Sequence, residues 1–432
     1  MIALFVFAFL GCAPAPPVAA GDLPKPPEAA PAAFAALAAD CRADGGALWG
    51  RSLCGPVLLV ERDSRLVWAN QAGAEGRLRA RDGVFSGRLG PEVPLANTAV
   101  DWGGTRWAMV LLPLPDDPRA TRRLLLHESF HRIQGELGLG MSNPQNAHLD
   151  GVDGRVLLQL EWRALAAALR APGDDAGARR SAVRDALLLR WRRQALFPAA
   201  REEEAGLERN EGLAEYTAVR LAGDTTDAIQ GLERGPRQPS FVRSFAYASG
   251  PAYGLLLDGA LPGWRARLDA RSDLGALLGE AYRVEHPADL AAAVAARSAV
   301  YGGPALAEAE RHRQEERTRR MNDYRKRLVD GPVLRLPFRK MSISFDPNAV
   351  EVLEGQGNVY PRGEIRDAWG LLRVSDGGML VDNDWSSVRV AATPDLVTKD
   401  GVVRGAGWTL ELGAGWRMVA GQRPGDATIA GP

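Results

Sequence analysis

The stretch from Leu124 to Ile133 reads Leu-Leu-Leu-His-Glu-Ser-Phe-His-Arg-Ile, and it is the strongest indication of fold and chemistry in the chain. Apolar residues at helical spacing predict a helix here. His127 and His131 are four residues apart, so a helix places both imidazoles on one face, within reach of one metal ion. Glu128 then lies beside the same ion, where its carboxylate can accept a proton from water. The stretch predicts a zinc-hydrolase helix with Glu128 as general base; the alternative is two histidines on a solvated face.

A catalytic zinc ion needs a third protein ligand, and the best candidate lies in the segment Asn-Glu-Gly-Leu-Ala-Glu-Tyr from Asn210 to Tyr216. This segment and the His-Glu helix resemble the two zinc motifs of the gluzincin metallopeptidases, especially their aminopeptidase branch. The resemblance covers these short motifs and implies a zincin-like domain in which Glu211 completes the coordination of one Zn²⁺ ion. Glu215, one helical turn on, is expected either to accept a hydrogen bond from a ligating histidine or to be a surface carboxylate.

The spacing of the two motifs departs from the family pattern. Glu211 follows His131 by 80 positions (211 − 131), whereas the family usually places this glutamate much closer. A helical hairpin over about 152–200 is therefore expected to loop out between the two site helices. The Gly-x-Met-Glu-Asn stretch with which the aminopeptidase branch binds the substrate amine does not occur in the sequence, so the chain diverges from that branch.

Two further residues are candidates for the third ligand. His148 follows the predicted site helix closely. Glu161 lies in an apolar helical stretch, where a carboxylate is costly unless it is paired or bound to a metal. Arg155 or Arg163 could instead pair with Glu161. Asp150, close to His148 in the sequence, is expected to orient a histidine.

Hydrolysis through a tetrahedral intermediate also needs a donor for the developing oxyanion. In gluzincins a tyrosine or histidine downstream of the third ligand often has this role, and here Tyr247 and Tyr253 lie in a segment dense in tyrosine and glycine. Either tyrosine could be the donor, and core packing is the alternative for both. The predicted strand over 105–112, just before the site helix, is expected either to line the cleft and pair with an extended substrate or to be an ordinary core strand.

The order of patterns along the chain predicts the α+β class: a mainly helical zincin-like catalytic domain with a β-rich N-terminal lobe and a C-terminal all-β domain. Apolar alternation broken by turn signals predicts the lobe over 46–118, helical periodicity the catalytic domain over 119–330, and short strands with glycine-rich turns the last domain over 331–432. Strands are expected at 56–60, 66–70, 76–80 and 105–112, and helices at 32–42, 154–170, 176–195, 203–222, 251–258 and 304–329.

The N-terminal residues indicate export. An apolar run over 2–10 is too short to span a bilayer and predicts a signal peptide over 1–20, followed by a leader over 21–45. The Leu-Gly-Cys ending at Cys12 resembles a bacterial lipoprotein signal, in which this cysteine is lipidated; cleavage after Ala19 or Ala20, or an unprocessed Ala/Pro leader, are the alternatives. Cys41 and Cys54 could then form a disulfide in the periplasm or cell envelope, or remain two buried thiols.

Composition limits the function classes. The chain has 432 residues, enough for two or three domains, and its formal net charge is zero, so no nucleic-acid partner is expected. Contact with a membrane is expected only through the N-terminal lipid. The leading hypothesis is a zinc peptidase acting on peptide or protein substrates. A zinc hydrolase of non-peptide amides or esters, and a non-catalytic envelope scaffold with a structural metal, are the alternatives.

Overall fold

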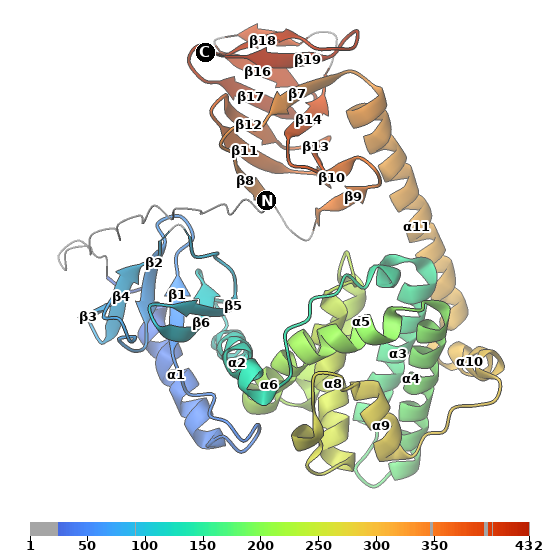
Figure 1. The fold of residues 1–432 in the computed structure, drawn as a ribbon. Coiled ribbons are helices and arrows are strands. Elements are labelled where there is room, and N and C mark those ends of the chain that lie inside the picture. Colours follow the sequence, from blue (N-terminus) through green and yellow to red (C-terminus); the bar gives the residue numbers. More distant parts are fainter. Residues whose placement is uncertain (1–24, 91, 346–348, 393–395, 400, 432) are drawn as a thin grey trace, which may run out of the picture. The chain divides into compact units, whose positions relative to one another are not determined.

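The computed structural model describes residues 25–90, 92–345, 349–392, 396–399 and 401–431. Cys12 and the predicted signal peptide lie outside these residues. Helices occupy the middle of the chain and strands the two ends, which confirms the α+β class (Figure 1). The chain divides into two compact units, the first containing residues up to Asp150 and 157–302, the second containing 151–156 and 303–432. Within the described ranges, no helix has both the length and the apolar character needed to cross a bilayer.

The first unit contains a mixed sheet with the strand order β3-β4-β2-β1-β6-β5. β1 and β6 are parallel and the other neighbours are antiparallel, and buried side chains such as Leu58, Val67 and Trp107 form its core. β4 and β5 were not predicted, because Gly87 and Asp101 interrupt their apolar alternation. The strands are β1 (Val57–Val60), β2 (Leu66–Ala69), β3 (Arg79–Arg81), β4 (Val84–Arg88), β5 (Thr98–Trp102) and β6 (Thr105–Leu111).

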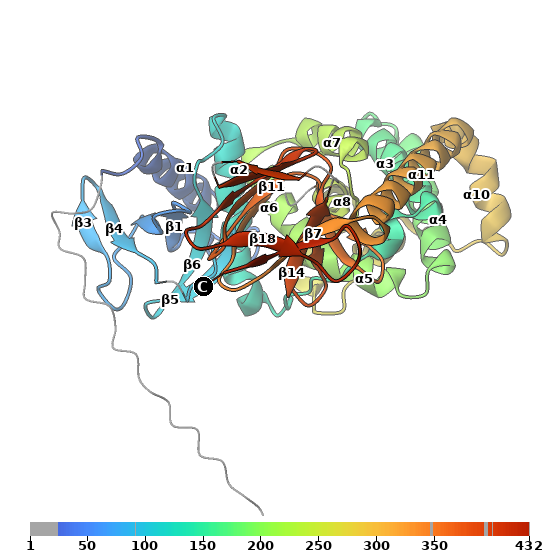
Figure 2. The ribbon, with the colours of Figure 1, turned by 90° about the horizontal axis from the view of Figure 1, so that it is seen from above.

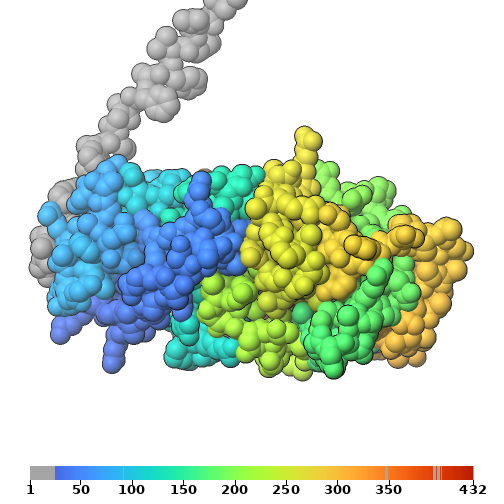
Figure 3. Space-filling view, turned by 90° about the horizontal axis from the view of Figure 1, so that it is seen from below, coloured from blue at the N-terminus to red at the C-terminus, as the bar shows by residue number. Residues whose placement is uncertain are grey.

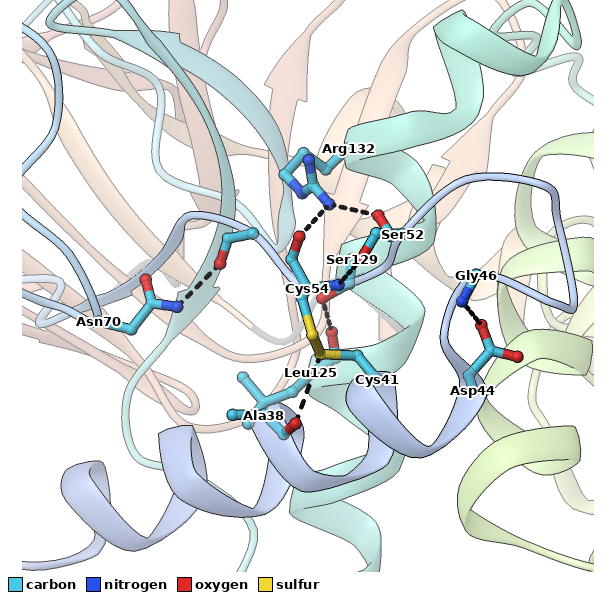
Figure 4. The surroundings of a disulfide bond; sticks show 11 residues. Ala38, Cys41, Asp44, Gly46, Ser52, Cys54, Asn70, Leu125, Ser129 and Arg132 are labelled. Atoms are coloured by element: carbon cyan, nitrogen blue, oxygen red, sulfur yellow. Dashed lines mark hydrogen bonds between the residues drawn. A yellow bond between two sulfur atoms is a disulfide. The ribbon is translucent and has the colours of Figure 1, made fainter.

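A disulfide fastens the first helix, α1 (Ala29–Asp44), to the segment that leads into the sheet (Figure 4). Cys41 and Cys54 form this bond with their Cα atoms 5.2 Å apart, which is the first of the two possibilities considered for them. Arg132 donates from one guanidinium nitrogen to the carbonyl oxygens of Ser52 and Cys54, at 3.0 and 3.3 Å. The crosslinked segment is thereby tied to the helix that carries His131.

That helix, α2 (Pro118–Gln134), covers the sheet at β5 and β6 (Figure 2). It begins where proline suits the first turn, and the Asp117 side chain caps it by accepting from Arg119 N at 3.0 Å. Leu125, Leu126 and Phe130 are fully buried on its inner side. The helix ends before a short 3₁₀ turn, Gly135–Leu137.

Among the remaining helices of the first unit, α6 packs on α2, and the surface of these helices is continuous with that of the N-terminal strands (Figure 3). The predicted hairpin over 152–200 is present as two long helices, whereas three short helices, α7, α9 and α10, were not predicted. A π-helical turn, Glu208–Gly212, joins α5 to α6. The helices are α3 (Val152–Arg170), α4 (Ala176–Leu196), α5 (Ala200–Leu207), α6 (Leu213–Ala222), α7 (Thr225–Arg234), α8 (Ser244–Ala260), α9 (Leu274–Tyr282) and α10 (Leu290–Ser298).

Besides 151–156, the second unit contains α11 (Gly303–Arg325). This helix was expected to belong with the preceding helices. The strands that follow form two sheets in the described residues, ordered β18-β19-β7-β14-β13-β10-β9 and β15-β16-β17-β12-β11-β8. Side chains of both sheets, among them Leu336, Leu372 and Leu410, share one buried core, so this part is a β-sandwich. The strands are β7 (Val333–Pro337), β8 (Ser342–Phe345), β9 (Glu351–Leu353), β10 (Gly357–Tyr360), β11 (Gly363–Asp367), β12 (Gly370–Val374), β13 (Met379–Asp382), β14 (Ser387–Ala391), β15 (Val397–Lys399), β16 (Val402–Gly405), β17 (Trp408–Leu412), β18 (Arg417–Ala420) and β19 (Ala427–Ala430).

Candidate metal centre

Three side chains meet where α2 faces the π-helical turn. The Nε2 atoms of His127 and His131 lie 3.3 and 3.6 Å from Glu211 Oε2, and 3.2 Å from each other. A zinc ion with four ligands at about 2.0–2.1 Å in a tetrahedron separates its ligand atoms by about 3.3 Å. These three residues, called the metal triad below, therefore have the spacing for one ion with a fourth position open. In the described part of the chain no other group of three or more such residues could hold an ion.

The Nδ1 atoms of both histidines, which point away from Glu211 and are called their outer nitrogens below, lie within hydrogen-bond distance of neighbouring side chains. Glu215 Oε2 lies 3.1 Å from His127 Nδ1, which is the role predicted for it. Gln134 Oε1 lies 2.9 Å from His131 Nδ1. Each acceptor favours a proton on Nδ1, so that Nε2 is the nitrogen that faces Glu211 and is left to bind an ion. Gln134 was not predicted, although its position three residues after His131 on the same helix was a usable signal.

The charges of the triad are strongly coupled. Burial disfavours the charged imidazole of His127, but the carboxylates of Glu211 and Glu215 outweigh burial and raise its pKa to about 10. Burial likewise opposes ionisation of Glu211, yet hydrogen bonds from both histidines hold its pKa below the usual range. A metal ion and these protons compete for the same atoms, because Nε2 must be unprotonated to bind an ion.

Glu128 lies beside the triad with one carboxylate oxygen unused. Only 3% of the residue is exposed, and its Oε2 is buried with no hydrogen-bond partner within the described residues. Burial raises the pKa of Glu128, and the nearby histidines partly offset this. A buried carboxylate oxygen without a donor is costly unless a ligand satisfies it. This orphaned oxygen fits a metal site whose bound water would lie next to Glu128.

Tyr247 contacts the triad from α8. Its hydroxyl donates to Glu211 Oε2 at 2.6 Å, and its ring stacks on that of His127 with centroids 5.4 Å apart. Burial and the charge of Glu211 raise its pKa, so the phenol remains a donor. Arg243, just before α8, donates to the other oxygen, Glu211 Oε1, at 3.0 Å. Of the two candidate donors, Tyr247 is thus the one that contacts the triad.

Two glycines allow this approach of α8 to the triad. A Cβ added to Gly212 would lie 3.2 Å from the Cα of Gly250, and one added to Gly250 would overlap the backbone of Gly212. The backbones of the π-helical turn and α8 therefore touch at a point where side chains do not fit. α6 and α8 lie side by side in both ribbon views (Figures 1 and 2). Gly250 in particular leaves no room for a side chain at this close approach of α8, the helix that carries Tyr247.

Tyr253, the other candidate donor, lies elsewhere, and core packing, the alternative considered for it, holds. It is fully buried and donates to Glu161 Oε1 at 2.7 Å. Successive turns of α8 direct the two tyrosines to different surroundings. Glu161 also accepts from Arg193 at 2.6 Å, which is neither of the arginines suggested for it.

The rival ligands His148 and Glu161 belong to this second group of charged side chains. His148 Nε2 lies 2.8 Å from Glu204 Oε1. Arg193 binds Glu204 with two nitrogens at 2.6 and 2.8 Å, and Arg190 binds Glu208 with two at 2.7 Å. We call the group the arginine cluster. It consists of the almost completely buried Arg190 and Arg193 of α4, Glu161, Glu204, Glu208 and Tyr253, with the half-buried His148 at its edge.

Asp150 does not orient either histidine of the triad. It accepts from the Ser240 hydroxyl at 2.8 Å and from Phe241 N at 2.9 Å. The outer nitrogens of His127 and His131 have the partners already described, so the predicted role is wrong. Asp150 instead fixes the segment just before Arg243.

The cleft beside the triad has a volume of about 310 Å³. β6 lies between β1 and β5, with Trp107 and Met109 buried. Residues 105–112 therefore form an ordinary core strand, which is one of the two roles considered for them. The strand that lines the cleft is β5, through Thr98 and the preceding Asn97. In the sheet, β5 has a neighbour on one side only.

Comparisons with protein families, with curated proteins and with solved structures return no match for this chain.

Proposed function

We propose that this chain is a zinc-dependent hydrolase of the gluzincin kind that cleaves peptides, with His127, His131 and Glu211 as ligands. The observation that carries the proposal is the orphaned oxygen of Glu128 beside three ligand atoms with tetrahedral spacing. Two histidines and a carboxylate are a common donor set for catalytic zinc. When bound, the ion supplies a Lewis acid that polarises a carbonyl group and acidifies water.

The chain's own residues then have distinct roles. Glu128 takes a proton from water at its free oxygen and returns one to the leaving group, a role for which burial and a raised pKa suit it. The Tyr247 hydroxyl donates to the carbonyl oxygen as negative charge develops there. Glu215 and Gln134 hold the histidine rings, so that the ligand atoms do not reorient during the reaction.

A peptide is the substrate class that the cleft supports best. β5 offers an unpaired strand edge to an extended backbone, which is a general mode of peptide recognition. Asn97 accepts from Leu111 N through Oδ1 at 2.8 Å, so its amide nitrogen is left to donate into the cleft. An amide or ester without an extended backbone would use neither feature.

The test compares the wild-type protein with Glu128→Gln and with the matched control Glu136→Gln, whose carboxylate is exposed in the 3₁₀ turn that follows α2. Metal analysis should find one zinc per chain in all three. Digestion of a peptide library, read by mass spectrometry, should fall about 10²–10⁴-fold in Glu128→Gln alone. An active Glu128→Gln protein would overturn the proposal. A zinc-loaded wild type that cleaves no peptide would favour a non-peptide amide or ester, and loss of fold on metal removal, without any hydrolysis, would favour a scaffold.

We also propose that the chain is exported to the periplasm or cell envelope, where a disulfide between Cys41 and Cys54 persists. Thiol labelling of the denatured protein, with and without prior reduction, tests this. Labelling of both cysteines without reduction in protein from its native compartment would contradict it.

A further inference from the structure

An apolar groove adjoins the metal cleft. It has a volume of about 510 Å³ and is lined by Leu111, Leu112, Pro113, Leu114 and Pro115 together with Leu124. Leu112, Leu114 and Leu124 are half-buried, and the two prolines are exposed. Contiguous exposed apolar surface of this kind usually marks a binding site. The groove needs an occupant whose chemistry the surrounding residues identify.

The groove and the cleft share two of their lining residues, Asn97 and Leu124. Leu124 precedes Glu128 by four positions on α2, so the groove begins about one helical turn, or ~5.4 Å, from the proposed general base. An extended peptide advances about 3.3 Å per residue. A chain held at the metal triad therefore reaches the groove within about two residues of the scissile bond.

The position of β5 gives the direction of this continuation. Asn97 and Thr98 are where the free strand edge begins, and Leu111, at the end of β6, is joined to Asn97 by a hydrogen bond. A peptide paired along β5 passes Asn97 and then runs over the segment that follows β6. That segment is itself held in place, because Leu112 N donates to Val60 O and the Thr121 hydroxyl to Pro115 O, both at 2.8 Å.

We propose that this groove is a second part of the substrate site, and that it takes apolar side chains of the peptide two to three residues from the scissile bond. The proposal rests on the proposed function for the position of that bond. The floor of the groove offers no charged group, and the two charged residues at its rim, Arg62 and Asp116, are exposed and of opposite sign. The groove therefore selects by apolar contact, and an acidic or basic side chain at these positions gains nothing.

The test measures binding and cleavage separately. Fluorescent eight-residue peptides with leucine at the second and third positions from the central bond, on either side, are compared with peptides that have serine there. Dissociation constants are measured on zinc-loaded Glu128→Gln protein, and kcat/KM on the wild type. We expect the leucine peptide on one side to be favoured about tenfold or more in both measurements.

The variant Leu114→Ser should lose this preference while keeping its zinc, and the matched control Leu196→Ser, a partly exposed leucine of α4, should retain it. Equal binding of leucine and serine peptides on both sides, or a preference unchanged by Leu114→Ser, would overturn the groove proposal. Selective binding without cleavage by the wild type would leave the groove standing and overturn the proposed function. Cleavage without selectivity would overturn the groove proposal and leave the proposed function standing.

Discussion

Two clusters of buried charges lie along the helical segment 200–222, and their carboxylates are partnered differently. In the arginine cluster, each carboxylate oxygen of Glu161, Glu204 and Glu208 accepts from a donor, mostly an arginine. Next to the metal triad, Glu128 is equally buried, but its Oε2 has no donor in the described residues.

This difference in hydrogen-bond partners distinguishes buried charges that stabilise the fold from a buried charge that is available to a ligand. A buried ion pair whose partners satisfy one another fixes the positions of the helices that supply them. A buried carboxylate with an unused oxygen leaves a desolvation cost that only a ligand removes, and such groups concentrate at active sites. The two clusters should therefore respond differently to the same substitution.

The largest effect is expected from replacing glutamate by glutamine in each cluster. Glu204→Gln removes the charge that balances Arg193 and should lower the free energy of unfolding by about 3–5 kcal/mol. Glu128→Gln removes no such partner and should change it by less than about 1 kcal/mol. Urea unfolding of both proteins without metal, with the exposed Glu202→Gln as control, measures this. Equal losses for Glu204 and Glu128 would remove the distinction between the clusters.

The two tyrosines of α8 sharpen the comparison. Tyr247→Phe removes the donor at the triad and should lower kcat about 10²–10³-fold with little change in stability. Tyr253→Phe leaves Glu161 without one of its donors and should lower the free energy of unfolding by about 1–3 kcal/mol. Steady-state kinetics and thermal melting of each variant are the measurements. A loss of kcat in folded Tyr253→Phe as large as in Tyr247→Phe would contradict the assignment.

A smaller effect is expected at Gln134. Gln134→Leu removes the acceptor that orients His131 and should weaken zinc binding about 10–100-fold. Competition with a chromophoric chelator measures the affinity. Unchanged affinity in a folded variant would show that the ring is held by packing alone. Gln194→Leu is the matched control, since this glutamine donates to Glu204 in the other cluster.

The smallest effect concerns pH. Burial opposes ionisation of Glu204, but Arg193 and His148 outweigh it and hold its pKa below the usual range. The folded state therefore binds this proton less readily than the unfolded state, and the stabilisation, complete above about pH 4.5, is lost as pH falls below it. One such group contributes at most ~1.4 kcal/mol per pH unit. Urea unfolding between pH 6 and 3 should show a shallower decline in Glu204→Gln than in the wild type.

Much of this architecture could be predicted from the sequence because it depends on local periodicity. The helix with His127 and His131 follows from its apolar spacing, and Glu211 from the short segment around it. The long helices and the C-terminal strands have equally regular patterns. The weakly patterned strand β5 was missed, although it lines the cleft, because Asp101 interrupts its apolar run.

The remaining features depend on contacts between distant segments. Glu161 was expected to pair with a neighbour on its own helix, but its partner Arg193 lies on the next helix, α4. Tyr253 and Tyr247 have similar surroundings in the sequence, but Tyr247 contacts Glu211 and Tyr253 contacts Glu161, because α8 packs against different segments at the two positions. No periodicity encodes such a choice.

The 80 positions between His131 and Glu211 (211 − 131) also bear on the order of folding. Closing a flexible loop costs about 0.6 kcal/mol more for each doubling of its length. The α3–α4 hairpin inside this loop makes local contacts, which form early. Once the hairpin is folded, Arg190 and Arg193 are in position to bind Glu204 and Glu208. Glu211 lies three residues after Glu208 in the same π-helical turn, so it takes its position together with them. Glu211 therefore takes its position late, and an ion at the proposed site would meet a largely folded chain instead of nucleating its folding.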